Sequence, residues 1–369
     1  MYRLNKVNFN KVFKINGISY RYTMEIQDLI RNHDYIQEFK KHKVVYRNYP
    51  ELNLMIVKRK YGTTYCPDNP WLNSCRGLVI DTKLNDIVVY PPVKAIEIQT
   101  YDQFKGIALG YQELIDGTMV NMFYHNESNK WLISTRSNIG CSNQWSTDMS
   151  FKDMFDDCSK NLDYETLNKS NTYSFVMRHK KNRIITPVFN NELYLVEVRC
   201  RGELMDIPRS DGWKCLQTIE PPSLSKNQTD MYKGYTVMIN GVRYKWLTAE
   251  CKFIEMIKPN TNNPLLNYLT LRHSGHLTNY LKLFPEERFR FDKYRKQVHQ
   301  LTGILHQFYL NVFVHKQIDK KDIPFALNPL MYDLHGIYLK EKQGISWSRV
   351  KNYIYELEPK RLCFALNNL

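Results

Sequence analysis

The sequence predicts an α+β protein in which a body of antiparallel strands is followed by an all-helical C-terminal domain. From about residue 72 to 250, short runs of β-branched and aromatic residues alternate with Asn, Gly and Asp, which is typical of strands joined by turns. After KPNTNNP (258–264) the apolar residues recur at helical spacing instead. The chain has 369 residues, of which 43% are hydrophobic, enough for two cores. We therefore expect domains at 1–258 and 265–369.

The individual elements follow from the same patterns. The first 70 residues combine strand-like runs such as NLMIVKRKYGTTY with a helix expected over residues 24–42. The strand-rich region contains RGLVIDTKLNDIVVY, GTMVNMFYHNESNKWLISTR, NTYSFVMRH, NELYLVEVRCRG and YTVMINGVRYKW. Hairpins are expected at HNESNK (125–130) and at Asn240-Gly241, because Asn-Gly favours two-residue turns. Helices are expected within 284–318 and 346–369, the latter with Ser346 or Ser348 as the N-cap.

Charge and cysteine usage limit the class of protein. The formal net charge is +15, and nucleic acid is the commonest polyanion met by such a surface, although a merely basic surface is the alternative. The eight cysteines form no C-x-x-C pair, which excludes the usual zinc-ribbon spacing and favours reduced thiols. No run approaches ~18 consecutive apolar residues. We expect an intracellular, cytoplasmic protein with no membrane partner, and virion association is the alternative location.

Five short stretches occur in a characteristic order: CRGLVID (75–81), LIDGTMV (114–120), YSFVMRHKKNRI (173–184), KGYTVMI (233–239) and YKWL (244–247). Together they resemble the RNA ligase family, most closely the phage-type ligases that reseal cut tRNA, and the resemblance covers nearly the whole chain. It implies an antiparallel-sheet nucleotidyltransferase body (ATP-grasp-like, as in RNA ligases) and a helical C-terminal domain that engages tRNA. DNA ligases and capping enzymes continue instead into a five-stranded barrel, which residues 265–369 do not predict.

The resemblance implies a three-step reaction that begins at a lysine in Lys-x-Asp-Gly. That lysine takes AMP from ATP, the AMP passes to an RNA 5′-phosphate, and a 3′-hydroxyl then displaces it. In this chain Leu114 stands at the lysine position, and a leucine side chain has no lone pair with which to form a phosphoramidate. No catalytic residue is therefore assigned. Lys94 and Lys105 are the nearby lysines that could stand in for the nucleophile.

Three further positions depart from the family's motifs. Ser174 and Lys233 stand where the family has glutamates, one of which helps hold the metal, and Leu247 replaces the second lysine of the last motif. The four family residues carry no net charge, whereas the four residues here carry one positive charge. Hard cations such as Mg²⁺ need oxygen ligands, so we expect metal affinity to be low and assign no metal site.

The positions that do match the family's motifs are assigned to nucleotide or phosphate binding by the resemblance. They are Arg76, Lys94, Asp116, Gly117, Arg136, Lys233, Gly234 and Lys245, and Arg183 matches a further basic position. Arginine and lysine side chains can hold a phosphate without metal. We expect Arg76, Asp116, Lys233 and Lys245 to converge on one concave surface, with Leu114 facing it.

Three functions are compatible with these residues. The first is a pseudoenzyme that binds RNA (tRNA or another nucleic acid) or nucleotide without adenylylating itself. The second is an active ATP-dependent RNA ligase with relocated catalytic groups, which would need ATP and Mg²⁺. The third is a structural or virion-associated protein that reuses the fold. Covalent AMP after incubation with ATP would distinguish the second from the others, and salt-dependent RNA binding would distinguish the first from the third.

Overall fold

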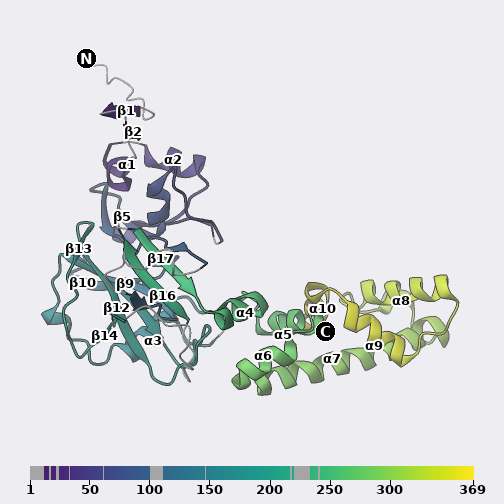
Figure 1. The fold of residues 1–369 in the computed structure, drawn as a ribbon. Coiled ribbons are helices and arrows are strands. Elements are labelled where there is room, and N and C mark those ends of the chain that lie inside the picture. Colours follow the sequence, from purple (N-terminus) through teal and green to yellow (C-terminus); the bar gives the residue numbers. More distant parts are fainter. Residues whose placement is uncertain are drawn as a thin grey trace, which may run out of the picture. The chain divides into compact units, whose positions relative to one another are not determined.

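The computed structural model describes residues 12–15, 18–21, 25–32, 34–60, 62–99, 111–145, 147–216, 218–219, 233–239 and 242–369. The chain divides into two compact units, Met1–Cys251 and Lys252–Leu369. The first unit contains the strands and the second is helical, so the predicted mixed α+β class with antiparallel sheets and a helical C-terminal region is confirmed (Figure 1). The division falls within helix α4 (Ala249–Ile257), before the boundary that the sequence indicates. Lys105 and the Asn240-Gly241 turn lie outside the described residues.

A four-stranded antiparallel sheet follows two short helices near the start of the chain. The strands, in spatial order, are β3 (Val45–Tyr49), β4 (Leu54–Lys58), β5 (Arg76–Asp81) and β6 (Asp86–Val89), and a separate hairpin joins β1 (Val12–Ile15) to β2 (Ile18–Arg21). The prediction of one helix over 24–42 is wrong. The segment forms α1 (Ile26–Asn32) and α2 (Tyr35–Lys41), because the Asp34 side chain accepts a hydrogen bond from the Gln37 N–H and so starts a new helix.

A six-stranded sheet forms the centre of the first unit. Its strands run in the order β10 (Lys130–Ser134), β9 (Thr118–His125), β11 (Asn171–Arg178), β12 (Glu192–Cys200) and β13 (Glu203–Met205), with β14 (Lys214–Cys215) parallel to β12. Residue 125 pairs with residue 130, which confirms the hairpin predicted at HNESNK. Helix α3 (Phe151–Cys158) buries Phe155 against Phe175 and Trp213 of this sheet.

The third sheet of the first unit carries the last two motifs. It runs in the order β15 (Thr218–Ile219), β8 (Tyr111–Glu113), β16 (Gly234–Ile239), β17 (Val242–Leu247) and β7 (Ile96–Glu97). β16 and β17 pair antiparallel with Ile239 opposite Val242, so the predicted hairpin is present. The other two sheets pack on each other through buried side chains that include Ile56, Val79 and Phe123.

The second unit is described in full and contains no strand, so a C-terminal five-stranded barrel is excluded for residues 252–369. Its helices are α5 (Pro264–His273), α6 (Leu277–Leu283), α7 (Arg288–Tyr309), α8 (Asn328–Glu341), α9 (Trp347–Glu356) and α10 (Pro359–Asn367). Ser346 is the N-cap of α9, since its side chain accepts a hydrogen bond from the Arg349 N–H. Across the described part of the chain, no helix is both long and apolar enough to cross a membrane.

At pH 8, iodoacetamide should alkylate Cys215 well before Cys75 and Cys141. All eight cysteines lie among the described residues and none forms a disulfide. Burial raises the pKa of Cys75 and of Cys141 to about 12, so roughly 10⁻⁴ of either thiol is ionised at pH 8. Cys215 is exposed. Peptide mass mapping over time measures the rates, with urea-unfolded protein as the control, and equal rates in the folded protein would contradict the described burial.

Candidate functional site

Asp116 and Lys233 form an ion pair inside the first unit. Asp116 follows β8 and Lys233 directly precedes β16, and the Leu114 N–H donates to the Gly234 carbonyl oxygen at 2.9 Å, which brings the two segments side by side. The Lys233 Nζ lies 2.8 Å from Asp116 Oδ1. The side chain of Asp116 is 1% exposed and that of Lys233 is 19% exposed. Two residues that the resemblance assigned to ligand binding therefore bind each other.

The second carboxylate oxygen of Asp116 is also occupied. Asp116 Oδ2 accepts hydrogen bonds from the backbone N–H groups of Ile185 at 2.7 Å and Thr186 at 2.9 Å. These amides belong to the segment that follows the Asn-Arg-Ile stretch of the third motif, where Arg183 itself donates to the Ile185 carbonyl oxygen. A buried carboxylate with three donors is fully satisfied. Asp116 thus connects the second, third and fourth motifs.

The glycines of the motifs are required by close backbone approach. A Cβ on Gly117 would lie 2.5 Å from the Met177 carbonyl oxygen, and a Cβ on Gly234 would lie 2.0 Å from the Trp246 carbonyl oxygen. Gly77 has φ +103°, and a Cβ there would lie 2.9 Å from the Cα of Arg136. Each glycine therefore has a packing reason in the protein without a ligand.

Four cations gather around Lys94, and we call the five residues the basic cluster: Arg59, Arg76, Lys94, Arg136 and Lys245. Arg76 lies on β5 and Lys245 on β17, whereas Arg59, Lys94 and Arg136 lie in the segments that follow β4, β6 and β10. Burial, followed by the positive charges of Arg76 and Arg59, lowers the pKa of Lys94. Lys245 and Arg136 lower this pKa further. Such mutual repulsion requires the charged groups to lie near one another. The sequence-predicted residues Arg76, Lys94, Arg136 and Lys245 are thus brought together, and Arg59 is an addition that the motifs did not indicate.

Most cations of the basic cluster contact carbonyl oxygens rather than carboxylates. Arg59 donates to the Thr64 carbonyl oxygen at 3.0 Å, Lys94 to that of Thr63, and Arg136 Nη2 to that of Arg59 at 2.7 Å. Lys245 pairs with Glu97 at 2.9 Å.

Arg76 differs from the other cations of the cluster. Within the described part of the chain, its guanidinium makes no hydrogen bond or ion pair, and its side chain is exposed. Surrounding protein atoms, together with the charges of Arg136 and Arg243, nevertheless lower its pKa. An exposed guanidinium amid protein atoms and other cations is open to an anionic ligand.

The three uncharged replacements are packed into the protein. Leu247 is 2% exposed, and Ser174 is 1% exposed with its Oγ donating to Asn121 Oδ1 at 2.8 Å. Leu114 is half-buried. A charged side chain at either fully buried position would need a partner inside the protein.

A buried ion triad lies next to the motif residues and was missed from the sequence. Glu197 on β12 is 4% exposed, and its oxygens pair with Arg199 and Arg243, each at 2.6 Å. Glu197 lies directly opposite Ser174 in the β11–β12 pairing. The available signal was a glutamate among inward-facing apolar positions of LYLVEVRC, which predicts a buried partner for its charge. Arg243 joins β17 to β12 in this way.

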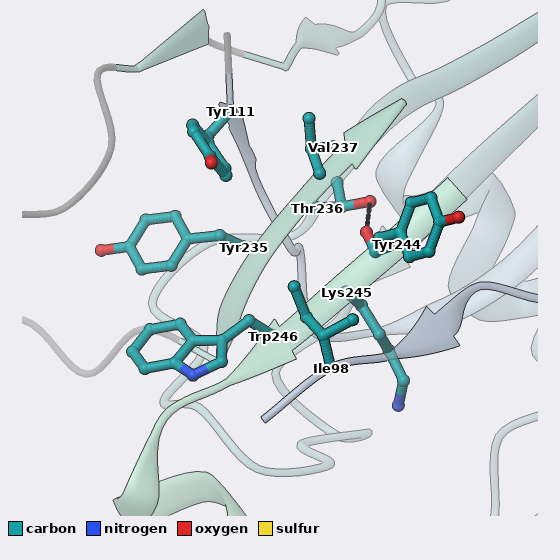
Figure 2. Close-up of a pocket in the computed structure, with 8 residues that line it drawn as sticks. All are labelled: Ile98, Tyr111, Tyr235, Thr236, Val237, Tyr244, Lys245 and Trp246. Atoms are coloured by element: carbon teal, nitrogen blue, oxygen red, sulfur yellow. Dashed lines mark hydrogen bonds between the residues drawn. The ribbon is translucent and has the colours of Figure 1, made fainter. Parts of the chain in front are cut away.

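A small apolar pocket lies on the β16–β17 hairpin. Figure 2 shows the rings of Tyr111, Tyr235 and Trp246 gathered on one side of it, and the Tyr235 and Trp246 rings stack at 5.7 Å. The Lys245 ammonium points away from these rings, as strand alternation requires (Figure 2). Thr236 Oγ1 donates to the Tyr244 carbonyl oxygen at 2.9 Å. Lys245 thus contributes to the lining of the pocket while its ammonium lies away from the rings.

The fold and the site define a mixed α+β protein with antiparallel sheets, an internal Asp–Lys pair and a cluster of cations. No protein-family model matches the sequence, and no curated protein matches it. In the described ranges, no group of three or more His, Cys, Asp or Glu residues could hold a metal ion.

Proposed function

We propose that the protein is an RNA-ligase-like pseudoenzyme that binds RNA or nucleotide without adenylylating itself. The observation that carries this proposal is the ion pair between Asp116 and Lys233. At the positions where the family's motifs have a nucleophilic lysine and a metal-binding glutamate, this chain has Leu114 and a lysine that neutralises Asp116. The charges of Asp116 and Lys233 are thus satisfied by each other.

The ion pair also bears on whether Lys233 could replace the missing nucleophile. An amine attacks phosphorus through its lone pair, so the lysine must first lose a proton. The Lys233 Nζ lies 2.8 Å from Asp116 Oδ1, and an attack on phosphorus would leave this buried carboxylate without its cationic partner. Lys94, the other described candidate, lies among four cations and donates to a carbonyl oxygen. Among the described residues, the carboxylate beside Lys233 is already held by that lysine and by two backbone N–H groups, and Lys94 contacts a carbonyl oxygen.

The binding half of the proposal rests on the basic cluster and on the net charge of +15. Neighbouring cationic side chains suit phosphate groups, and the exposed Arg76 guanidinium can bind a phosphate through two parallel N–H donors. A purely structural role would not require an exposed guanidinium beside other cations. RNA binding measured by fluorescence anisotropy should therefore weaken as salt rises, and absence of binding at low salt would favour a structural role.

Incubation with ATP and Mg²⁺ should leave the mass of the wild-type protein unchanged, and Leu114→Lys should behave in the same way. The new ammonium would lie near Lys233, while the carboxylates that position a metal would still be missing. Losing one preorganised electrostatic group typically costs about 10²–10³ in rate. Intact-protein mass spectrometry provides the measurement. A gain of one AMP on the wild-type chain would replace this proposal with the active-ligase alternative.

Restoring all four motif positions together is the matched gain-of-function experiment. The variant combines Leu114→Lys, Ser174→Glu, Lys233→Glu and Leu247→Lys, and we expect detectable AMP transfer where the fold is preserved. Because Ser174 and Leu247 are buried, the variant should also be less stable, so its thermal unfolding has to be measured beside its activity.

A further inference from the structure

We infer that the basic cluster binds a phosphate chain, a ligand with several negative charges at one place, and that it does so without a divalent metal. This inference rests on the proposed function and names the ligand chemistry of the same site. It concerns Arg59, Arg76, Lys94, Arg136 and Lys245. The Arg59 carbonyl oxygen accepts from Arg136 Nη2 at 2.7 Å, and the Arg59 N–H donates to the carbonyl oxygen of Cys75, the residue before Arg76, at 2.8 Å.

The first argument is the concentration of charge. Arg59, Arg76 and Lys94 have no acidic partner within the described residues, and Lys245 forms an ion pair with Glu97. Lys58, whose Nζ donates to Ser137 Oγ at 2.8 Å, adds a further cation beside Arg136. Like charges held together in this way repel one another, and the fold has to offset that repulsion. A ligand with several negative charges would relieve it.

The second argument separates a phosphate chain from the backbone of a nucleic acid. Phosphodiesters carry one charge per nucleotide, spread along the strand, and are usually met by a stripe of cations. In the basic cluster, Arg59, Lys94 and Arg136 instead all contact carbonyl oxygens of one short stretch of backbone, those of residues 64, 63 and 59. This arrangement fits the di- or triphosphate of a free nucleotide or the 5′-triphosphate of an RNA end, which share this chemistry.

The third argument concerns the metal. Mg²⁺ prefers oxygen ligands, and the carboxylate of Glu97 is already paired with Lys245 at 2.9 Å. Lys233 places one more ammonium where the motif pattern would have a carboxylate, and it neutralises Asp116. Mg²⁺ bound to a phosphate chain would cancel part of the negative charge that attracts the cluster. Magnesium should therefore weaken binding instead of strengthening it.

The test is isothermal titration calorimetry of the full chain with inorganic tripolyphosphate, in EDTA and in excess Mg²⁺. We expect binding in EDTA and weaker binding in Mg²⁺. Arg76→Ala should lower the affinity in EDTA about 10-fold or more, because it removes charge-assisted hydrogen bonds. Arg76→Lys should lower the affinity less, since it keeps the charge and loses the planar fork. Arg209→Ala, which removes an exposed arginine outside the cluster, is the matched control and should bind as the wild type does.

Two results would overturn the inference: binding of tripolyphosphate only when Mg²⁺ is present, or equal loss of affinity in Arg76→Ala and Arg209→Ala. Competition then distinguishes the ligand sources. Displacement by ATP or by a 5′-triphosphorylated oligoribonucleotide, but not by the same RNA with a 5′-hydroxyl, supports the inference. Equal displacement by the 5′-hydroxyl RNA contradicts it, because internal phosphodiesters would then suffice. Covalent AMP would instead refute the proposed function alone, since it leaves metal-free binding of tripolyphosphate intact.

Discussion

Gly234→Ala should destabilise the first unit by at least about 3 kcal/mol, the combined effect of overpacking and backbone strain. The new Cβ would lie 2.0 Å from the Trp246 carbonyl oxygen and 3.0 Å from the Leu247 Cα, and both are backbone atoms that cannot turn away. Gly234 has φ +156°, and its pairing with Leu247 starts the β16–β17 ladder. The substitution must therefore separate β16 from β17. These strands carry Gly234 and Lys245, and Lys233 directly precedes β16. Urea denaturation followed by tryptophan fluorescence measures the loss.

Gly303→Ala is the matched control for this substitution. Gly303 lies in α7, and a Cβ there would meet no atom within 4 Å, so alanine should stabilise that helix by about 0.4–1 kcal/mol. If Gly234→Ala also stays within about 1 kcal/mol of the wild type, the packing explanation fails. The glycine would then be needed for approach of a ligand, as the resemblance implies.

Sequence patterns predicted the long elements because these depend on local spacing. The strands that contain TMVNMFYH and NTYSFVMR are long enough for β-branched and aromatic residues to dominate, and α7 buries Phe291, Val298 and Leu305 at helical spacing. Strands of two or three residues, such as β7 and β8, are too short for any period and form only because neighbouring strands offer hydrogen-bond partners. The break before α2 depends on one side chain, Asp34, whose capping role competes with continuation of the helix.

The sequence indicated which residues belong to the site, but not which of their side chains contact each other. Motif spacing selected Asp116 and Lys233 separately, but 117 positions separate them, and no local pattern indicates that their side chains meet. The same limit applies to Arg59, which belongs to none of the five motifs and comes close to Lys94 only in the folded chain. For Glu197 the sequence does predict a contact, because a carboxylate among the inward-facing apolar residues of a strand requires a cationic partner. Which cation is chosen depends on the packing of β17 against β12.

Asp116→Ala should be the most destabilising single substitution at the site, by about 3–5 kcal/mol, the typical cost of removing one partner of a buried ion pair. The substitution leaves the Lys233 ammonium without its counter-ion and removes the acceptor for the backbone N–H groups of Ile185 and Thr186. Lys233→Met should cost less, because both amides still bind the carboxylate and the lysine side chain is partly exposed. Chemical denaturation of each variant provides the free energies of unfolding.

The double variant Asp116→Ala/Lys233→Met decides whether the ion pair itself contributes. Removing both charges leaves no unpaired ion, so the double variant should lose clearly less stability than the two single losses added together, with an interaction energy of about 1–3 kcal/mol. The two amides lose their acceptor in both Asp116 variants, so the comparison cancels their contribution and isolates the contact between Asp116 and Lys233. Additive losses would mean that the ammonium stabilises nothing at this position. Asp116 would then be held mainly by residues 185 and 186, and the internal ion pair could no longer support the proposal that the protein does not adenylylate itself.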